Sequence, residues 1–332
     1  MRIKKYLAFI IRVILDAFRH TKKVVTILKT VKSNGITSLL KIFIINTYYL
    51  FPKLRKSVQL HNLKIIESQD KDLIKSENFK AEKVIKSLEN DGCSSEYLIQ
   101  KDILSKILDE IFEQNNEDAV LWKKGDTEDS NRRPEESKEK YLKRLADNDT
   151  GQGRVMIPID LRKSKVIREL ILSKTFVNIA QNFLDKKDFS VGVSCLISSP
   201  RKSNPSVMEK IHNAQLYHFD NDFSKFCKLY IYLTDVNDLN GPHRFIKKSH
   251  RYRKFEHMLM RPISDQEATD NYPVIKKYTG DAGTFFFTDG FGYHKADELK
   301  EQSRIMLNIH FGYEKIKYYK QDLYFKNNEL IN

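Results

Sequence analysis

The pattern of hydrophobic and polar positions divides the chain into a helical first part and a β-rich second part. Apolar residues at helical spacing predict helices over residues 2–32, 80–90, 104–112 and 164–185. The second of these ends at Asp91-Gly92, a sequence typical of the turn that closes a helix. Residues 123–138 show no apolar periodicity and are expected to form a loop.

From Gly151 onward the pattern changes to short runs of β-branched and aromatic residues between Gly, Pro, Asn and Asp turns, which predicts strands. The runs cover residues 154–159, 189–197, 215–219, 229–234, 283–288 and 306–313. Several short strands with long connections are typical of an antiparallel sandwich or barrel of jelly-roll type. The sequence therefore predicts an α+β protein with a jelly-roll core at about 151–315, preceded by a helical lead-in at 65–150 that packs outside it.

Positive charge is concentrated at the start of the chain. The whole chain has a formal net charge of +14, but residues 1–64 contain 14 Lys and Arg and one acid, Asp16. This extension contains two apolar runs, at residues 2–32 and 36–51. Charged residues interrupt both, Arg12 in the first and Lys41 in the second, so neither is expected to span a membrane. Two interpretations stay open: the basic amphipathic helices lie on an anionic membrane surface, or their apolar faces pack on the main domain or a partner.

The remaining composition narrows the class of protein. Charged residues make up 31% of the chain, and three cysteines are far apart in sequence, which favours a reducing compartment and a cytoplasmic location. We expect all three to be small buried side chains. Nucleic acid is not an expected partner, because the positive charge is mixed with long aliphatic stretches rather than with exposed aromatic residues.

The strongest local motif is Tyr217-His218-Phe219-Asp220, on a predicted strand. Side chains two residues apart on a strand point to the same face, so His218 and Asp220 can bind one metal ion. Such a pair also occurs as a structural hydrogen bond, so the prediction depends on a third ligand. His294 supplies one, because it follows a predicted strand and turn and is expected near the end of that strand.

Other histidines compete for the third position. His310 lies on the same predicted strand as Arg304 and is the reserve candidate. His212 lies in a loop, where it either faces the substrate or is exposed to solvent. His243 and His250 follow turns and are expected at the surface or behind the metal ligands.

These residues resemble the phytanoyl-CoA dioxygenase family over roughly residues 189–311. The motifs are YHFDNDFSKFCKLYIYLTDV, NGPHRFIKKSHR and GDAGTFFFTDGFGYHK, followed by Arg304. The resemblance implies a double-stranded β-helix that binds one Fe(II) through His218, Asp220 and His294. It also implies that 2-oxoglutarate chelates the iron and pairs its far carboxylate with Arg304. One departure is FIKKSH, where many members have Pro-Gly before Ser-His, and this puts the substrate in question rather than the chemistry.

Two histidines and one carboxylate leave three positions open on octahedral iron, enough for the keto acid and O2. Lys228 and Tyr230 alternate with apolar residues and are candidates to contact 2-oxoglutarate, although a half-exposed strand shows the same alternation. Gln215 is a weaker candidate. Related halogenases have a small residue at the position of Asp220, so the resemblance favours hydroxylation of a C–H bond.

The function predicted is therefore an Fe(II)- and 2-oxoglutarate-dependent dioxygenase that hydroxylates a small or lipid-linked organic substrate. The alternative is a jelly-roll binding module without catalysis, docked to a membrane or a partner by its basic extension. The retention of all three candidate ligands argues against the alternative.

Overall fold

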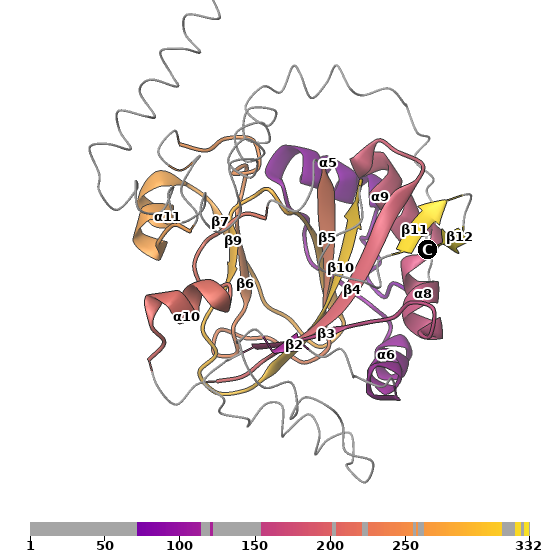
Figure 1. Cartoon of the computed structure of the whole chain (residues 1–332). Helices are drawn as coiled ribbons and strands as arrows, with labels where there is room; N and C mark the ends of the chain where they lie inside the picture. The colour runs from indigo at the N-terminus through magenta and orange to yellow at the C-terminus, as the bar shows by residue number, and fades with distance from the viewer. Residues whose placement is uncertain are drawn as a thin grey trace, which may run out of the picture. The chain divides into compact units, whose positions relative to one another are not determined.

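A computed structural model describes most of the chain after residue 71 (Figure 1). The described residues are 72–113, 120–121, 154–200, 204–220, 225–254, 257, 262–313, 323–326 and 329–331. The helices expected in the basic extension and the loop expected at 123–138 lie outside these ranges. Within them, no helix is long and apolar enough to cross a membrane.

The larger of two sheets is antiparallel throughout and is built around three long neighbours. β10 (Arg304–Gly312) pairs with β5 (Phe226–Tyr232) on one side and with β4 (Phe189–Ser198) on the other. The remaining strands extend these three outward: β8 (Thr284–Asp289) and β1 (Tyr97–Leu98) beyond β5, and β3 (Arg154–Pro158), β2 (Val120–Leu121), β11 (Leu323–Lys326) and β12 (Glu329–Ile331) beyond β4. The strands expected from residue 151 onward are thus confirmed, except the one at 215–219.

The smaller sheet is also antiparallel and contains β7 (Ile275–Tyr278), β6 (His243–Ile246) and β9 (His294–Ala296), in that order. The segment predicted as a strand at 215–219 joins its edge only through isolated bridges. Its pairing partner changes at each step: Tyr217 bridges Ile263, and His218 bridges His294. A continuous ladder cannot form when successive residues pair with different segments, so the prediction of a regular strand was wrong here.

The helices before the core lie against one face of the larger sheet (Figure 1). They are α5 (Ala81–Asp91), α6 (Lys101–Glu113), α8 (Lys165–Ile171) and α9 (Lys174–Leu184). Gly92 ends α5 with φ of 80°, as Asp91-Gly92 predicted. The single helix expected at 164–185 is two helices, because Ser173 accepts a hydrogen bond from the Phe176 amide and so begins α9.

Two short helices complete the described secondary structure. α10 (Val207–His212) precedes the HxD motif, and α11 (Asp265–Asn271) precedes β7. Both begin with a capping box, formed by Ser206 with Glu209 and by Ser264 with Glu267.

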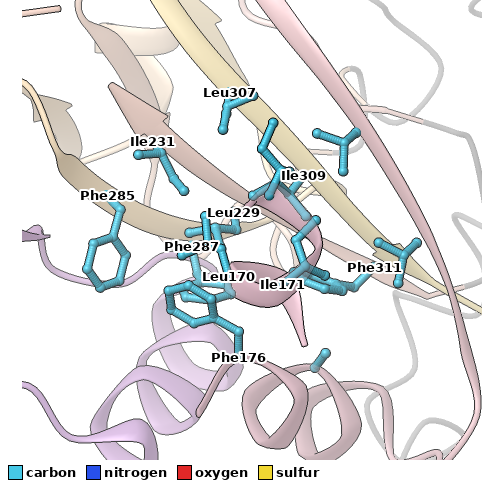
Figure 2. Close-up of a cluster of buried hydrophobic side chains, with 14 of the residues drawn as sticks. Leu170, Ile171, Phe176, Leu229, Ile231, Phe285, Phe287, Leu307, Ile309 and Phe311 are labelled. Carbon is cyan, nitrogen blue, oxygen red and sulfur yellow. The ribbon is translucent and has the colours of Figure 1, made fainter. Parts of the chain in front are cut away.

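Alternation along β5, β8 and β10 gives the larger sheet two different faces. One face packs on the helices in an apolar core, which Figure 2 shows in part. The labelled core side chains are Leu170, Ile171, Phe176, Leu229, Ile231, Phe285, Phe287, Leu307, Ile309 and Phe311. The residues between them point the other way, toward the smaller sheet. Tyr278 of β7 and Phe286 of β8 stack there with ring centroids 3.7 Å apart, so the two sheets face one another.

Candidate metal centre

Three side chains at the edge of the smaller sheet form a group that can hold a metal ion. One ligand atom from each of His218, Asp220 and His294 lies within 4.8 Å of the other two. The His294 Nε2 atom is 3.4 Å from Asp220 Oδ2, and the His218 Nε2 atom is 3.9 Å from Asp220 Oδ1. Ligand bonds of about 2.0–2.2 Å let atoms at this separation reach a common ion. The structure thus brings together the three residues that the sequence singled out.

Backbone pairing sets this geometry. His218 and His294 exchange two backbone hydrogen bonds, of 3.0 and 2.8 Å, which places their imidazoles on the same face with centroids 4.5 Å apart. The Asp220 amide donates to the Gly290 carbonyl at 2.9 Å. His294 begins β9 rather than ending the preceding strand as expected, because the turn at 290–293 separates it from β8.

The two imidazoles are fixed in the tautomer that a metal requires. His218 Nδ1 lies 2.9 Å from the Leu216 carbonyl, and His294 Nδ1 lies 2.9 Å from the Gly292 carbonyl. A carbonyl oxygen only accepts, so we assign a proton to Nδ1 of each ring. Each Nε2 is then the ring nitrogen that would bind a metal ion, as in most histidine-ligated metal sites.

Asp220 remains ionised although it is buried. Burial alone would raise the pKa of its carboxyl group, but the ammonium of Lys228 and the nearby His294 and His218 outweigh burial and hold that pKa well below its usual range. Lys228 Nζ is 2.6 Å from Asp220 Oδ2. An ionised carboxylate is the form that binds a divalent cation.

Arg304 is a buried cation on the facing sheet. It is the first residue of β10, as expected, and is 2% exposed. Nη1 donates to the Gly241 carbonyl and Nη2 to Ser198 Oγ at 3.4 Å, while Nε has no hydrogen-bond partner among the described residues. Burial lowers the pKa of the guanidinium. A buried guanidinium that is bonded only to neutral groups favours an anionic ligand.

The other candidate residues differ in how near they lie to the triad. Lys228 and Tyr230 lie on the face of β5 that points toward the smaller sheet, and Lys228 reaches the triad directly. Gln215 is buried, and its Oε1 has no hydrogen-bond partner among the described residues. His310 also points between the sheets, where it stacks on Phe226, and it does not belong to the triad.

His243 is the residue that sequence reasoning underrated. A surface position was one expectation for it and for His250, yet they are 4% and 1% exposed. The His243 ring lies 5.5 Å from that of His294 and 4.7 Å from that of Tyr230, whereas His250 Nε2 lies 3.1 Å from the Glu89 carbonyl. Alternation along β6 carried the signal, because His243 shares a face with the core residue Phe245. The side chain of His212 lies outside the described part.

The site thus combines a His-Asp-His group at the edge of one antiparallel sheet with a buried arginine on the facing sheet. This combination is suited to a metal-dependent enzyme. Residues 75–306 match the sequence profile of the phytanoyl-CoA dioxygenase (PhyH) family. The chain belongs to this family, and the resemblance recognised from the sequence is confirmed. Among curated proteins, none matches the chain significantly.

Several solved structures are similar at low sequence identity. The non-haem α-ketoglutarate-dependent epimerase SnoN from nogalamycin biosynthesis is 14% identical, with a TM-score of 0.46, covering 70% of this chain and 82% of its own. EctD from S. alaskensis with bound Fe is 13% identical, with a TM-score of 0.47 and coverages of 75% and 82%. HygX from Streptomyces hygroscopicus with nickel and 2-oxoglutarate bound is 10% identical, with a TM-score of 0.45 and coverages of 69% and 85%.

Proposed function

We propose that this protein is an Fe(II)- and 2-oxoglutarate-dependent dioxygenase that hydroxylates a C–H bond of a small or lipid-linked organic substrate. The observation that carries the proposal is the pairing of two features across the sheets. One is the group of His218, Asp220 and His294, and the other is Arg304, a buried cation whose hydrogen bonds go to a carbonyl and a hydroxyl group. A metal ion and a dianionic cosubstrate together match both features. The two facing sheets are, in this proposal, the halves of a double-stranded β-helix.

The donor set fits Fe(II). Two neutral imidazoles and one carboxylate on one side of an ion form the arrangement that non-haem Fe(II) oxygenases use, and it leaves positions for other ligands. Lys228 keeps Asp220 ionised, and the carbonyls behind the imidazoles hold each Nδ1, which leaves Nε2 as the metal-binding nitrogen of each ring. When bound, iron and 2-oxoglutarate together supply the oxidising chemistry, in which O2 is consumed and succinate and CO2 are released.

The chain's own residues position the cosubstrate and keep water out. Arg304 binds the far carboxylate of 2-oxoglutarate, since its planar fork suits a carboxylate and it lies on the strand facing the triad. Tyr230 and Lys228 are the proposed further contacts, and Gln215 stays a weaker proposal. Aromatic side chains from both sheets, including Tyr232, Phe245 and Phe286, pack around the space between the triad and Arg304 and exclude bulk water.

Purified protein tests the proposal directly. With Fe(II), ascorbate and O2, 2-oxoglutarate should be converted to succinate, and chelation of the iron should stop the reaction. His294→Ala should abolish turnover, whereas Lys86→Met, a change on the exposed surface of α5, should not. If the wild-type protein neither forms succinate nor binds 2-oxoglutarate in the presence of metal, the proposal is wrong. Metal-dependent binding of 2-oxoglutarate without any turnover would favour the binding module.

The extension at 1–64 adds a second proposal, that a domain at 65–332 is held at an anionic membrane face in the cytoplasm, near a lipid-linked or membrane-proximal substrate. The net charge of +13 in this segment supports it. Each basic residue near such a surface contributes roughly 1 kcal/mol, less at high salt. Co-sedimentation with phosphatidylserine liposomes should be strong for the full chain and weak for a chain starting at Glu67. Equal partitioning of both would leave the extension a structural role.

A further inference from the structure

We propose that His243 is a further cosubstrate-binding residue, which donates a hydrogen bond from Nε2 to the carboxylate of 2-oxoglutarate that lies beside the metal. This inference rests on the proposed function. It is carried by the position of His243 between the triad and Arg304, and by a buried ring nitrogen that the described residues do not satisfy.

The position follows from contacts on both sides of His243. Toward the metal, its ring stacks on that of His294, with centroids 5.5 Å apart and planes 24° apart. Toward the larger sheet, its ring lies 4.7 Å from that of Tyr230. Toward the other end of the site, Arg304 donates to the Gly241 carbonyl, only two residues before His243. A ligand that joins the triad to Arg304 therefore passes along this ring.

The backbone holds the residue firmly in this place. The His243 amide donates to the Tyr232 hydroxyl at 3.1 Å, and that hydroxyl donates to the Tyr278 carbonyl at 3.0 Å. His243 is also paired with Tyr278 on β7 and with Ala296 on β9. Because the main chain is fixed on three sides, the ring cannot move far to satisfy its nitrogen elsewhere.

The nitrogen itself indicates the kind of ligand. His243 Nε2 is buried and has no hydrogen-bond partner within the described ranges. An unsatisfied buried polar atom destabilises the protein, and a ligand removes this cost if it supplies the partner. An imidazole that carries a proton on Nε2 offers an N–H there, which a carboxylate oxygen accepts.

The alternative for His243 is a purely structural one, in which its ring only supports His294. His243→Phe separates the two roles because it keeps an aromatic ring against His294 and Tyr230 while removing the N–H. His243→Gln retains a donor, and His243→Met has a similar length without one, so these two form a matched pair if the phenylalanine variant does not fold.

The experiment measures binding rather than turnover. Protein loaded with Mn(II), which avoids reaction, is titrated calorimetrically with 2-oxoglutarate and with pyruvate, a keto acid that lacks the far carboxylate. We expect His243→Phe to weaken both keto acids about ten- to a hundredfold, with Mn(II) affinity unchanged. Arg304→Ala should instead weaken 2-oxoglutarate alone. His243→Gln should bind both keto acids more tightly than His243→Met.

Three results overturn the inference. Unchanged keto acid affinity in His243→Phe would show that the N–H is not used, while intact binding by the wild-type protein would leave the proposed function standing. A loss of Mn(II) affinity in His243→Phe and His243→Met alike would assign His243 to the support of His294. Failure of the Mn(II)-loaded wild-type protein to bind 2-oxoglutarate would remove the proposed function together with the inference.

Discussion

Replacing Lys228 with methionine should destabilise the metal-free protein much more than the metal-loaded protein. Lys228 and Asp220 form a buried ion pair at 2.6 Å, with side chains 12% and 11% exposed. Removing one partner of such a pair leaves an uncompensated buried charge, which costs about 3–5 kcal/mol. We expect the lower end, about 3 kcal/mol, because His218 and His294 remain near the carboxylate.

A divalent ion on Asp220 changes this balance, because the ion supplies the positive charge that the variant lacks. For a domain of this size, about 3 kcal/mol corresponds to a fall in Tm of roughly 6–12 °C. Thermal unfolding followed by circular dichroism should show that fall with chelator present and a fall less than half as large at saturating Mn(II). Folding and metal binding form a thermodynamic cycle, so the folded variant must bind Mn(II) more tightly than the wild-type protein. The affinity should rise about tenfold for each 1.4 kcal/mol by which the loss of unfolding free energy in chelator exceeds the loss in Mn(II).

A matched control is the exposed pair of Lys86 and Glu82 on α5, at 2.5 Å with side chains 65% and 43% exposed. Lys86→Met removes the same kind of charge, but solvent screens it, so Tm should hardly change with or without metal. Equal falls for Lys228→Met in chelator and in Mn(II) would refute the argument that Lys228 and the metal share the charge of Asp220. A fall no larger than that of Lys86→Met would refute the argument from burial.

Three other outcomes are expected. Arg304→Ala should weaken 2-oxoglutarate binding to the Mn(II)-loaded protein by about 2–5 kcal/mol, and Arg304→Lys should recover only part of this; unchanged calorimetric affinity in both would move the carboxylate partner elsewhere, first to Lys228. Gly292→Ala should destabilise the fold by about 1–3 kcal/mol in urea unfolding, because its Cβ would collide with the Phe245 ring, and a neutral effect would contradict that packing. All cysteines should resist iodoacetamide at pH 8 until the protein unfolds, because burial raises their thiol pKa values, to about 11 for Cys93 and about 12 for Cys195; mass spectrometry of the folded protein should find no label on Cys93, Cys195 or Cys227.

The predictions from sequence were most accurate where a rule about neighbouring residues applies. Alternation along β5 distinguished the apolar face from the face with Lys228 and Tyr230. The spacing of His218 and Asp220 put both on one side of the chain, even though the segment is not a regular strand. Both predictions depend only on residues near in sequence, which explains their success.

Features that depend on distant contacts were not predictable in this way. The break between α8 and α9 depends on a single serine cap inside a continuous apolar pattern. Alternation along β6 shows only that His243 and Phe245 share a face; that this face is buried depends on β6 lying between β7 and β9, a pairing that the order of elements along the chain does not reveal. Likewise, the residues next to Arg304 in sequence do not show that it is buried beside neutral groups, which is the main argument for its binding an anion.

The reciprocal backbone bonds between His218 and His294 have a consequence for hydrogen exchange. Each residue's amide proton is held by the other's carbonyl, so both imidazoles stay in place only while the two segments do not slide past one another. Fluctuations that separate these segments would expose both amides to solvent and pull the ligand atoms apart in a single event. An ion bound to both rings would act as a clasp across the pair, and the deuterium uptake of these two amides would slow together when the ion binds.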